Sequence, residues 1–191
     1  QTPWMAPATK QAAIQKLDAM LFEVGHPTEW TEYEYNISPN TYFNNVIRAR
    51  SGAVRRELER LSYPVDRRHW GQLSVTAVNA FYSREVNTLF VPAGVLQPPF
   101  FSRHYSPARN YGSVGAVMAH EMTHGFDDVG RLYDPHEMLR DWWTKNDVAQ
   151  FQQRAQCISD YYSNLREGGK AVNGELTLGD DIADMGGVKV A

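Results

Sequence analysis

The stretch His120-Glu121-Met122-Thr123-His124 decides how the rest of this chain is interpreted. On a helix, positions i and i+4 lie one above the other, so the two histidines face the same side. Two imidazole nitrogens held in this way can occupy two sites of a tetrahedral Zn²⁺ ion. Glu121 directly follows the first histidine, where its carboxylate can act as general base and activate a zinc-bound water.

The alternative is that two histidines simply lie on the exposed face of a helix. The residues before the motif argue against it, because Val114, Val117 and Met118 predict an apolar, buried helix over about residues 112–126. Buried histidines and a buried glutamate need polar partners, and a metal ion supplies one. We therefore favour the metal site.

A third protein ligand is expected, since a catalytic zinc usually has three and leaves one position for water. The segment Gly179–Gly187 (GDDIADMGG) places Asp180 and Asp184 four residues apart on one helical face. One carboxylate can bind the metal while the other accepts a hydrogen bond from a ligand histidine. Alternatively, Asp180 or Asp181 is only a helix N-cap. The residues alone leave both interpretations open.

Composition places the chain among ordinary globular proteins. It has 191 residues, 42% hydrophobic and 21% charged, with a formal net charge of −3. Nothing in this balance points to nucleic acid or to an anionic membrane surface. The sequence has no apolar run of about 18 residues, so no membrane segment is expected within the chain. Its first residues have no features of a signal peptide, and we expect them to come from the middle of a longer polypeptide.

The remaining patterns predict mostly helices. We expect helices at about 8–24, after Asn40, at about 141–165 and at about 180–190, with short strands and turns between 75 and 101. The helix after Asn40 has an apolar stripe formed by Phe43, Ile47, Val54, Leu58 and Leu61. The 141–165 helix has another, expected in the core, formed by Val148, Phe151, Ala155, Ile158, Tyr162 and Leu165.

Four separated motifs resemble the neprilysin family of zinc endopeptidases, which includes the endothelin-converting enzymes: His120–Asp128 (HEMTHGFDD), Asn79–Tyr82 (NAFY), Pro92–Phe101 (PAGVLQPPFF) and Gly179–Gly187. The resemblance implies an α+β, mostly helical fold, a thermolysin-like (gluzincin) zinc peptidase catalytic domain truncated at both ends. It implies that residues 1–63 are a helical segment continuing from a missing N-terminal domain. Residues 64–191 would then be a partial catalytic domain.

The resemblance also assigns roles to residues of the site. His120 and His124 match zinc ligands, and Glu121 matches the catalytic base. Asp184 matches an aspartate that supports a ligand histidine and is counted with the catalytic residues, and Asp127 matches a further acidic residue supporting the zinc site.

Substrate contacts are implied as well. Asn79 and Ala80 match an edge strand that pairs with the peptide substrate. Four apolar positions match a pocket for the side chain after the scissile bond: Val95, Phe100, Ala116 and Val117. The simpler interpretations are a turn residue for Asn79 and core packing for the apolar positions.

Two departures from the family stand out. The family's third ligand is a glutamate followed by asparagine, whereas this chain has Asp180-Asp181, one methylene shorter. The family also supplies a histidine and an arginine further downstream, and the sequence ends at Ala191 before either.

The resulting hypothesis is a zinc-dependent metalloendopeptidase that hydrolyses oligopeptides, with Zn²⁺ as cofactor. Its partners would be peptide substrates and the missing N- and C-terminal parts of the same protein. By resemblance we expect an extracellular or membrane-anchored ectodomain. Two alternatives remain: a catalytically incomplete zinc- or peptide-binding fragment, and a structural fragment without metal.

Overall fold

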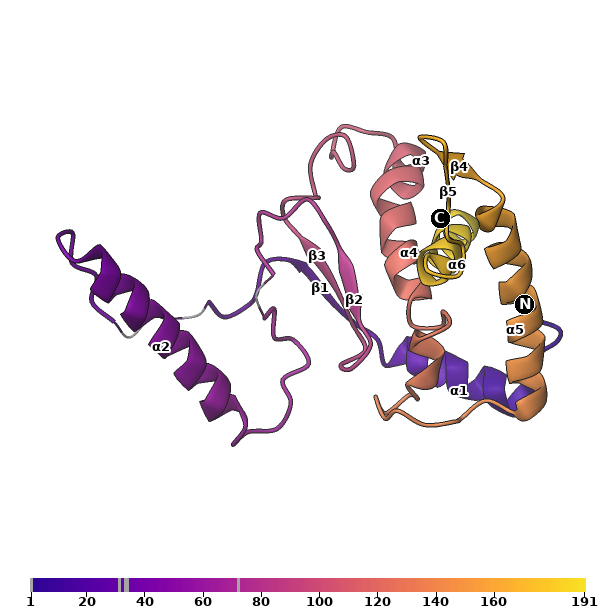
Figure 1. Ribbon diagram of the computed structural model, residues 1–191, viewed down its shortest axis with the longest axis horizontal. Coiled ribbons are helices and arrows are strands. Elements are labelled where there is room, and N and C mark those ends of the chain that lie inside the picture. Colours follow the sequence, from indigo (N-terminus) through magenta and orange to yellow (C-terminus); the bar gives the residue numbers. More distant parts are fainter. Residues whose placement is uncertain (1, 31, 33–34, 72) are drawn as a thin grey trace.

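The computed structural model describes residues 2–30, 32, 35–71 and 73–191. Figure 1 shows helices α1, α4, α5 and α6 grouped on one side of a small sheet, with α2 standing apart on the other side. The helices are α1 (Pro7–Asp18), α2 (Tyr42–Arg60), α3 (Pro107–Asn110), α4 (Ala116–Thr123), α5 (Lys145–Ser163) and α6 (Leu178–Val190). The strands are β1 (Leu21–Gly25), β2 (Phe81–Ser83), β3 (Thr88–Pro92), β4 (Arg166–Glu167) and β5 (Lys170–Ala171). The predicted mostly helical α+β class is confirmed.

The three-stranded sheet has the order β1-β3-β2. Strand β1 runs parallel to β3, and β2 runs antiparallel to it. β3 is buried along its whole length, as expected for a central strand. The sheet joins α4 through an apolar core that contains Ala80, Leu89, Val91 and Val95, with Leu96, Phe100, Val117, Met118 and Met122 packed against it. This core fixes the metal-motif helix relative to edge strand β2.

The predicted first helix at about 8–24 is wrong after Asp18. α1 ends at Asp18, and Leu21–Gly25 forms strand β1. The strand alternates as a half-buried strand should: Phe22 and Val24 are exposed, whereas Glu23 is buried and paired with Arg68. Pairing with β3, more than 60 residues along the chain, gives this segment its extended form.

α2 forms where a helix was expected, but it starts after Thr41 and has no side-chain cap. Its apolar stripe is exposed. α1 and β1, by contrast, pack against elements beyond residue 63. The division into residues 1–63 and 64–191 stays a prediction.

The other helices differ from expectation mainly at their ends. A π-helical turn at Tyr111–Gly115 precedes α4, and α5 begins after Thr144, whose Oγ1 accepts the backbone N–H of Asp147. Of the predicted core stripe on α5, only Ala155 is fully buried, and Leu165 lies outside the helix and is exposed. None of the helices that the structure describes is long and apolar enough to cross a membrane.

Candidate metal centre

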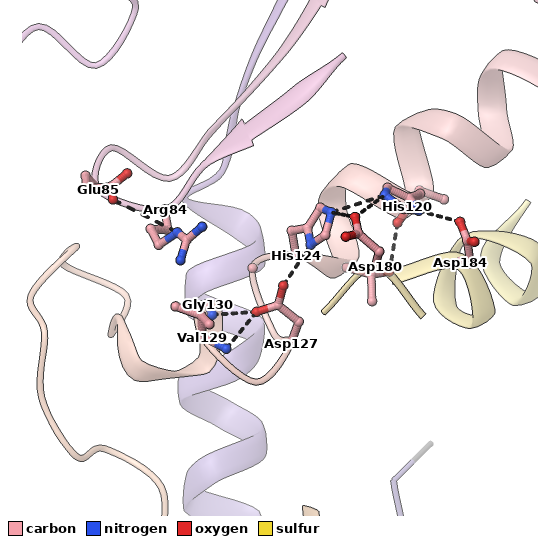
Figure 2. A network of polar contacts seen from close by, with 12 residues as sticks. Arg84, Glu85, His120, His124, Asp127, Val129, Gly130, Asp180 and Asp184 are labelled. Atoms are coloured by element: carbon pink, nitrogen blue, oxygen red, sulfur yellow. Dashed lines mark hydrogen bonds and ion pairs between the residues drawn. The ribbon is translucent and has the colours of Figure 1, made fainter. Parts of the chain in front are cut away.

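Helix α4 and the residues beside it position both histidines of the motif. His120 lies on α4 and His124 is its C-terminal capping residue. Figure 2 shows both rings facing Asp180, each held from behind by another aspartate. Asp184 Oδ1, from α6, lies 2.7 Å from His120 Nδ1. Asp127 Oδ2 lies 2.7 Å from His124 Nδ1.

These contacts determine what the other ring nitrogens can do. An ionised carboxylate only accepts hydrogen bonds, so each Nδ1 carries the proton and a neutral ring keeps its lone pair at Nε2. The two Nε2 atoms lie 3.1 Å apart. Two lone pairs facing each other at this distance repel, so a cation between them, or a second proton on one ring, is required.

The carboxylate of Asp180 completes a set of three candidate ligands. Its Oδ1 lies 4.0 Å from His120 Nε2 and 3.8 Å from His124 Nε2. All three ligand atoms fall within 4.8 Å of one another. A triangle with sides of 3.1, 3.8 and 4.0 Å has a point about 2.1 Å from every corner, which is the usual zinc–ligand distance for nitrogen and oxygen. The donor set therefore fits zinc.

Close packing of α6 against α4 brings the aspartates to the histidines. A Cβ added at Gly186 would lie 2.3 Å from Thr123 Oγ1, and one at Gly187 would lie 2.8 Å from the carbonyl oxygen of Ala116. Only glycine permits this approach. The N-cap of α6 is Thr177, so neither Asp180 nor Asp181 caps the helix. Asp181 is buried and accepts a hydrogen bond from the Thr177 hydroxyl.

His124 and Asp127 shift each other's pKa through their hydrogen bond and their opposite charges. Burial on its own would lower the pKa of His124, but the hydrogen bond and charge of Asp127, together with the charges of Glu121 and Asp180, outweigh it and raise that pKa. Burial would raise the pKa of Asp127, but hydrogen bonds from His124 and from the backbone N–H groups of Gly130 and Val129 lower it below its usual range. Asp127 therefore stays ionised, and its negatively charged carboxylate accepts the hydrogen bond from His124 Nδ1.

Glu121 lies beside the histidines and is 8% exposed. Burial raises its pKa, and the nearby histidines and a backbone hydrogen bond with Tyr82 oppose the shift without cancelling it. A carboxylate with a raised pKa accepts a proton more readily near neutral pH, as a general base requires.

The site opens into a polar cleft of about 560 Å³. Asn79 and Ala80, just before strand β2, line it together with Phe81 and Tyr82 of that strand. The structure does not bring all the predicted substrate residues to this cleft. Val95, Phe100 and Val117 belong to the apolar core described above instead. Their role in binding a substrate side chain stays a prediction.

Three residues around the site were not expected from the sequence. Tyr82 bonds Glu121 through its backbone and donates its hydroxyl to Asn87 Oδ1 at 2.8 Å. Arg84 lines the cleft, and Lys16 contacts the loop that follows α4. Tyr82 lies in the predicted NAFY motif, which could have marked it. Arg84 and Lys16 carry no local signal.

Comparison with known proteins gives one consistent family. The model of peptidase family M13 matches residues 79–191. An endothelin-converting enzyme homolog of Locusta migratoria is 40% identical over 196 aligned positions, which cover 98% of this chain and 27% of that protein. Neprilysin-11 of Caenorhabditis elegans is 41% identical over 202 positions, covering 100% of this chain and 24% of that protein.

Solved structures agree. Zinc metalloprotease Zmp1 of Mycobacterium tuberculosis, in complex with an inhibitor, matches with a TM-score of 0.91 and 38% identity over 98% of this chain and 30% of that one. PepO of Lactobacillus rhamnosis matches with a TM-score of 0.89 and 33% identity over the same shares. The chain spans about a quarter of the length of the curated relatives it matches. Its matched segment contains both histidines, Glu121 and both candidate aspartates of α6, and the chain belongs to peptidase family M13.

Proposed function

We propose that this chain carries the zinc site and the general base of a metalloendopeptidase that hydrolyses peptide bonds of oligopeptides. One observation carries the proposal: both histidines are fixed from behind by carboxylates, so that their Nε2 atoms converge 3.1 Å apart beside a buried glutamate. His120, His124 and Asp180 would hold the ion. Asp127 and Asp184 would orient the two rings.

Zinc, when bound, polarises the substrate carbonyl and makes an attacking water more acidic. The residues of the chain then divide the work. Glu121 accepts the proton of the water and passes it to the leaving amine. Its raised pKa supports the first step, because a more basic carboxylate accepts a proton more readily. Asp184 and Asp127 keep the Nδ1 protons on the rings, so that each Nε2 lone pair would be available to hold the ion.

Strand β2 supports binding of an extended peptide. It forms one edge of the sheet and lines the cleft next to the histidines. An edge strand offers free backbone groups to which a substrate can add as a further strand. Asn79, at the start of this edge, accepts the backbone N–H of Ala80 with its side chain and is exposed to a ligand.

Metal binding and hydrolysis can be separated by mutation. We expect the chain to bind close to one zinc, and His120→Ala or His124→Ala to abolish binding. Glu121→Ala should keep the metal, measured by elemental analysis, while removing any chelator-sensitive cleavage of a fluorogenic peptide. Loss of the metal in the Glu121 variant would contradict the division of roles.

The cleavage assay should include the 191-residue chain and a longer M13 protein that contains it, at equal zinc occupancy. Transition-state donors supplied by other parts of such a protein are each worth about 10²–10³ in rate. Zinc binding with no cleavage by either protein would favour the alternative, a zinc- or peptide-binding fragment that is catalytically incomplete.

A further inference from the structure

Lys16 on α1 is completely buried, 0% exposed. Its ammonium group donates to three backbone carbonyl oxygens: those of Gly125 at 2.7 Å, Gly130 at 2.8 Å and Tyr133 at 2.8 Å. An ammonium has three N–H donors and no acceptor, so every donor is used. A buried charge is tolerated only when it is satisfied in this way. The three contacts connect helix α1 to residues 125–133.

All three acceptors lie on the loop that follows the metal-motif helix. The same loop carries Asp127, between two of the carbonyls that Lys16 binds. Asp127 Oδ1 accepts the backbone N–H of Val129 at 2.9 Å and of Gly130 at 2.6 Å, while its Oδ2 holds His124. The loop turns so tightly that a Cβ at Gly130 would lie 1.8 Å from the carbonyl oxygen of His124. The ammonium of Lys16 thus holds carbonyl groups on both sides of Asp127 in the chain.

The position of Lys16 is itself fixed to the sheet beside the active site. Asn87, which is 0% exposed, donates from Nδ2 to the carbonyl oxygen of Lys16 at 2.9 Å and accepts from the hydroxyl of Tyr82. Burial and the neighbouring carboxylates act in opposite directions on the charge of Lys16. Burial lowers the pKa of Lys16 to about 8, and the carboxylates of Asp127, Asp134 and Glu137 act in the opposite direction. Three carbonyl dipoles favour the protonated form as well.

We propose that Lys16 is a positioning residue of the zinc site: it fixes residues 125–133 so that Asp127 keeps the proton of His124 on Nδ1 and leaves Nε2 free for the metal. The inference rests on the proposed function, in which His124 is a zinc ligand. The ammonium of Lys16 bonds backbone carbonyls and none of the candidate ligand atoms, so we expect it to act through Asp127. A lysine that merely stabilised the fold would leave the tautomer of His124 and its metal affinity unchanged in the folded protein.

The first test substitutes Lys16→Met and uses Lys10→Met as the matched control. Lys10 lies on the same helix but outside the loop contacts. In the metal-free 191-residue chain, ¹⁵N shifts of the His124 ring report the tautomer at a pH where titration shows the ring to be neutral. We expect the parent and Lys10→Met to have the proton on Nδ1, and Lys16→Met to show a mixture of tautomers.

The second test measures zinc affinity by competition with a chelator in the same proteins. Loss of a group that orients a ligand typically weakens metal binding about 10–100-fold, and we expect this range for Lys16→Met and no change for Lys10→Met. Because the effect passes through Asp127, Lys16→Met should add little to the loss caused by Asp127→Ala. Additive losses in the double variant would overturn the proposal.

Rescue provides the last control. Lys16→Cys in a Cys157→Ser background, aminoethylated while unfolded and then refolded, restores an ammonium at nearly the original length and should restore the affinity. If Lys16→Met does not fold, Lys16→Gln, which keeps an amide donor without the charge, replaces it. A folded variant with parental tautomer and affinity overturns the proposal. If the parent chain itself binds no zinc, the proposed function fails, while the tautomer of His124 still decides whether Lys16 positions it.

Discussion

The proposed function of Glu121 and its burial place opposite demands on the charge of its carboxyl group. A general base must be an ionised carboxylate, yet its burial favours the neutral form and raises its pKa above the usual 4.5. Active sites commonly sacrifice stability in this manner. The carboxylate that we propose as general base thus lies where a neutral side chain would favour the fold.

We therefore expect Glu121→Gln to stabilise the metal-free chain at neutral pH. An acid whose pKa is raised in the folded state favours folding below its unfolded pKa, and this advantage disappears as the pH rises and the group must ionise. The gain from glutamine should appear above about pH 4.5 and vanish below it. Urea unfolding in excess chelator at several pH values measures the difference. A pH-independent gain would show that packing, not ionisation, is responsible.

Asp180 allows a test of ligand length. Its carboxylate oxygen lies 3.8–4.0 Å from the two Nε2 atoms, and its side chain is 74% exposed, so one more methylene has room. We expect Asp180→Glu to tighten zinc binding, and Asp180→Ala to weaken it by at least about tenfold, since even partners of a ligand are worth this much. Chelator competition measures both variants.

Asp181→Ala is the matched control for this test. Asp181 is the next residue of the same helix, but it is turned toward Thr177. It should lose stability and keep zinc. Equal zinc affinity in Asp180→Ala and the parent would remove Asp180 from the ligand set.

The site residues that could be predicted from sequence are those that lie close together in the chain or belong to a known motif. His120, Glu121 and His124 fall within five residues on one helix, so helical spacing alone brings them together. Lys16 has no such signal, because its partners are backbone carbonyls 109 to 117 residues away, and every residue type offers that group. Likewise, no local pattern distinguishes Asp180, which faces the two histidines, from Asp181, which bonds Thr177.

At the scale of elements, the contact of α6 with α4 determines whether the proposed third ligand, Asp180, reaches the site. A methyl group at position 186 would overlap the side chain of Thr123. We expect Gly186→Ala to destabilise the chain by about 1–3 kcal/mol, as overpacking does. It should also weaken zinc binding, because it moves Asp180 and Asp184 away from the histidines. Urea unfolding and chelator competition measure the two effects.

Two further variants test whether the overlap with Thr123 causes these losses. Thr123→Ala removes the atoms with which the new methyl group would overlap, so the double variant should recover much of both losses. Gly112→Ala is the control, because a Cβ there meets nothing within 4 Å. If Gly186→Ala binds zinc as tightly as the parent, helix separation does not control the ligand set.

Elements were predictable where the local pattern agreed with the long-range contacts. Apolar spacing located α2, α5 and α6 to within a few residues, because the backbone hydrogen bonds of a helix are formed within the helix itself. It failed at Leu21–Gly25, which is a strand only because β3 pairs with it. It also failed for the extent of the metal-motif helix, where five residues adopt a π-helical turn just before α4. Such turns often accompany functional sites and leave no simple trace in apolar spacing.

At the scale of the whole molecule, α2 differs from every element near the site. Figure 1 shows it apart from the sheet and the other helices. Its side-chain contacts reach the segment just before it: Asn45 bonds Ser38, and Arg48 bonds Asn36. Its apolar stripe, Phe43, Ile47, Val54, Leu58 and Leu61, is 46–81% exposed. Helices owe most of their stability in proteins to packing of such a face.

We therefore expect α2 to open far more readily than α4 in the 191-residue chain. Local opening free energies range from near zero for unsupported segments up to the global value in the core. Amides of Tyr42–Arg60 should exchange at least about a hundredfold faster than those of Ala116–Thr123, a difference of about 3 kcal/mol. Hydrogen exchange followed by mass spectrometry measures both segments in one experiment.

Concentration separates the two ways in which this expectation could fail. An exposed apolar stripe can be covered by a second copy of the chain, and protection of α2 would then rise with protein concentration. Phe43→Ser together with Leu58→Ser should abolish such protection, whereas Arg55→Ser on the same helix should not. Protection of α2 that equals that of α4 at every concentration, and survives the double substitution, would mean that local contacts with residues 35–38 suffice to hold the helix. The exposed stripe would then contribute nothing to its stability.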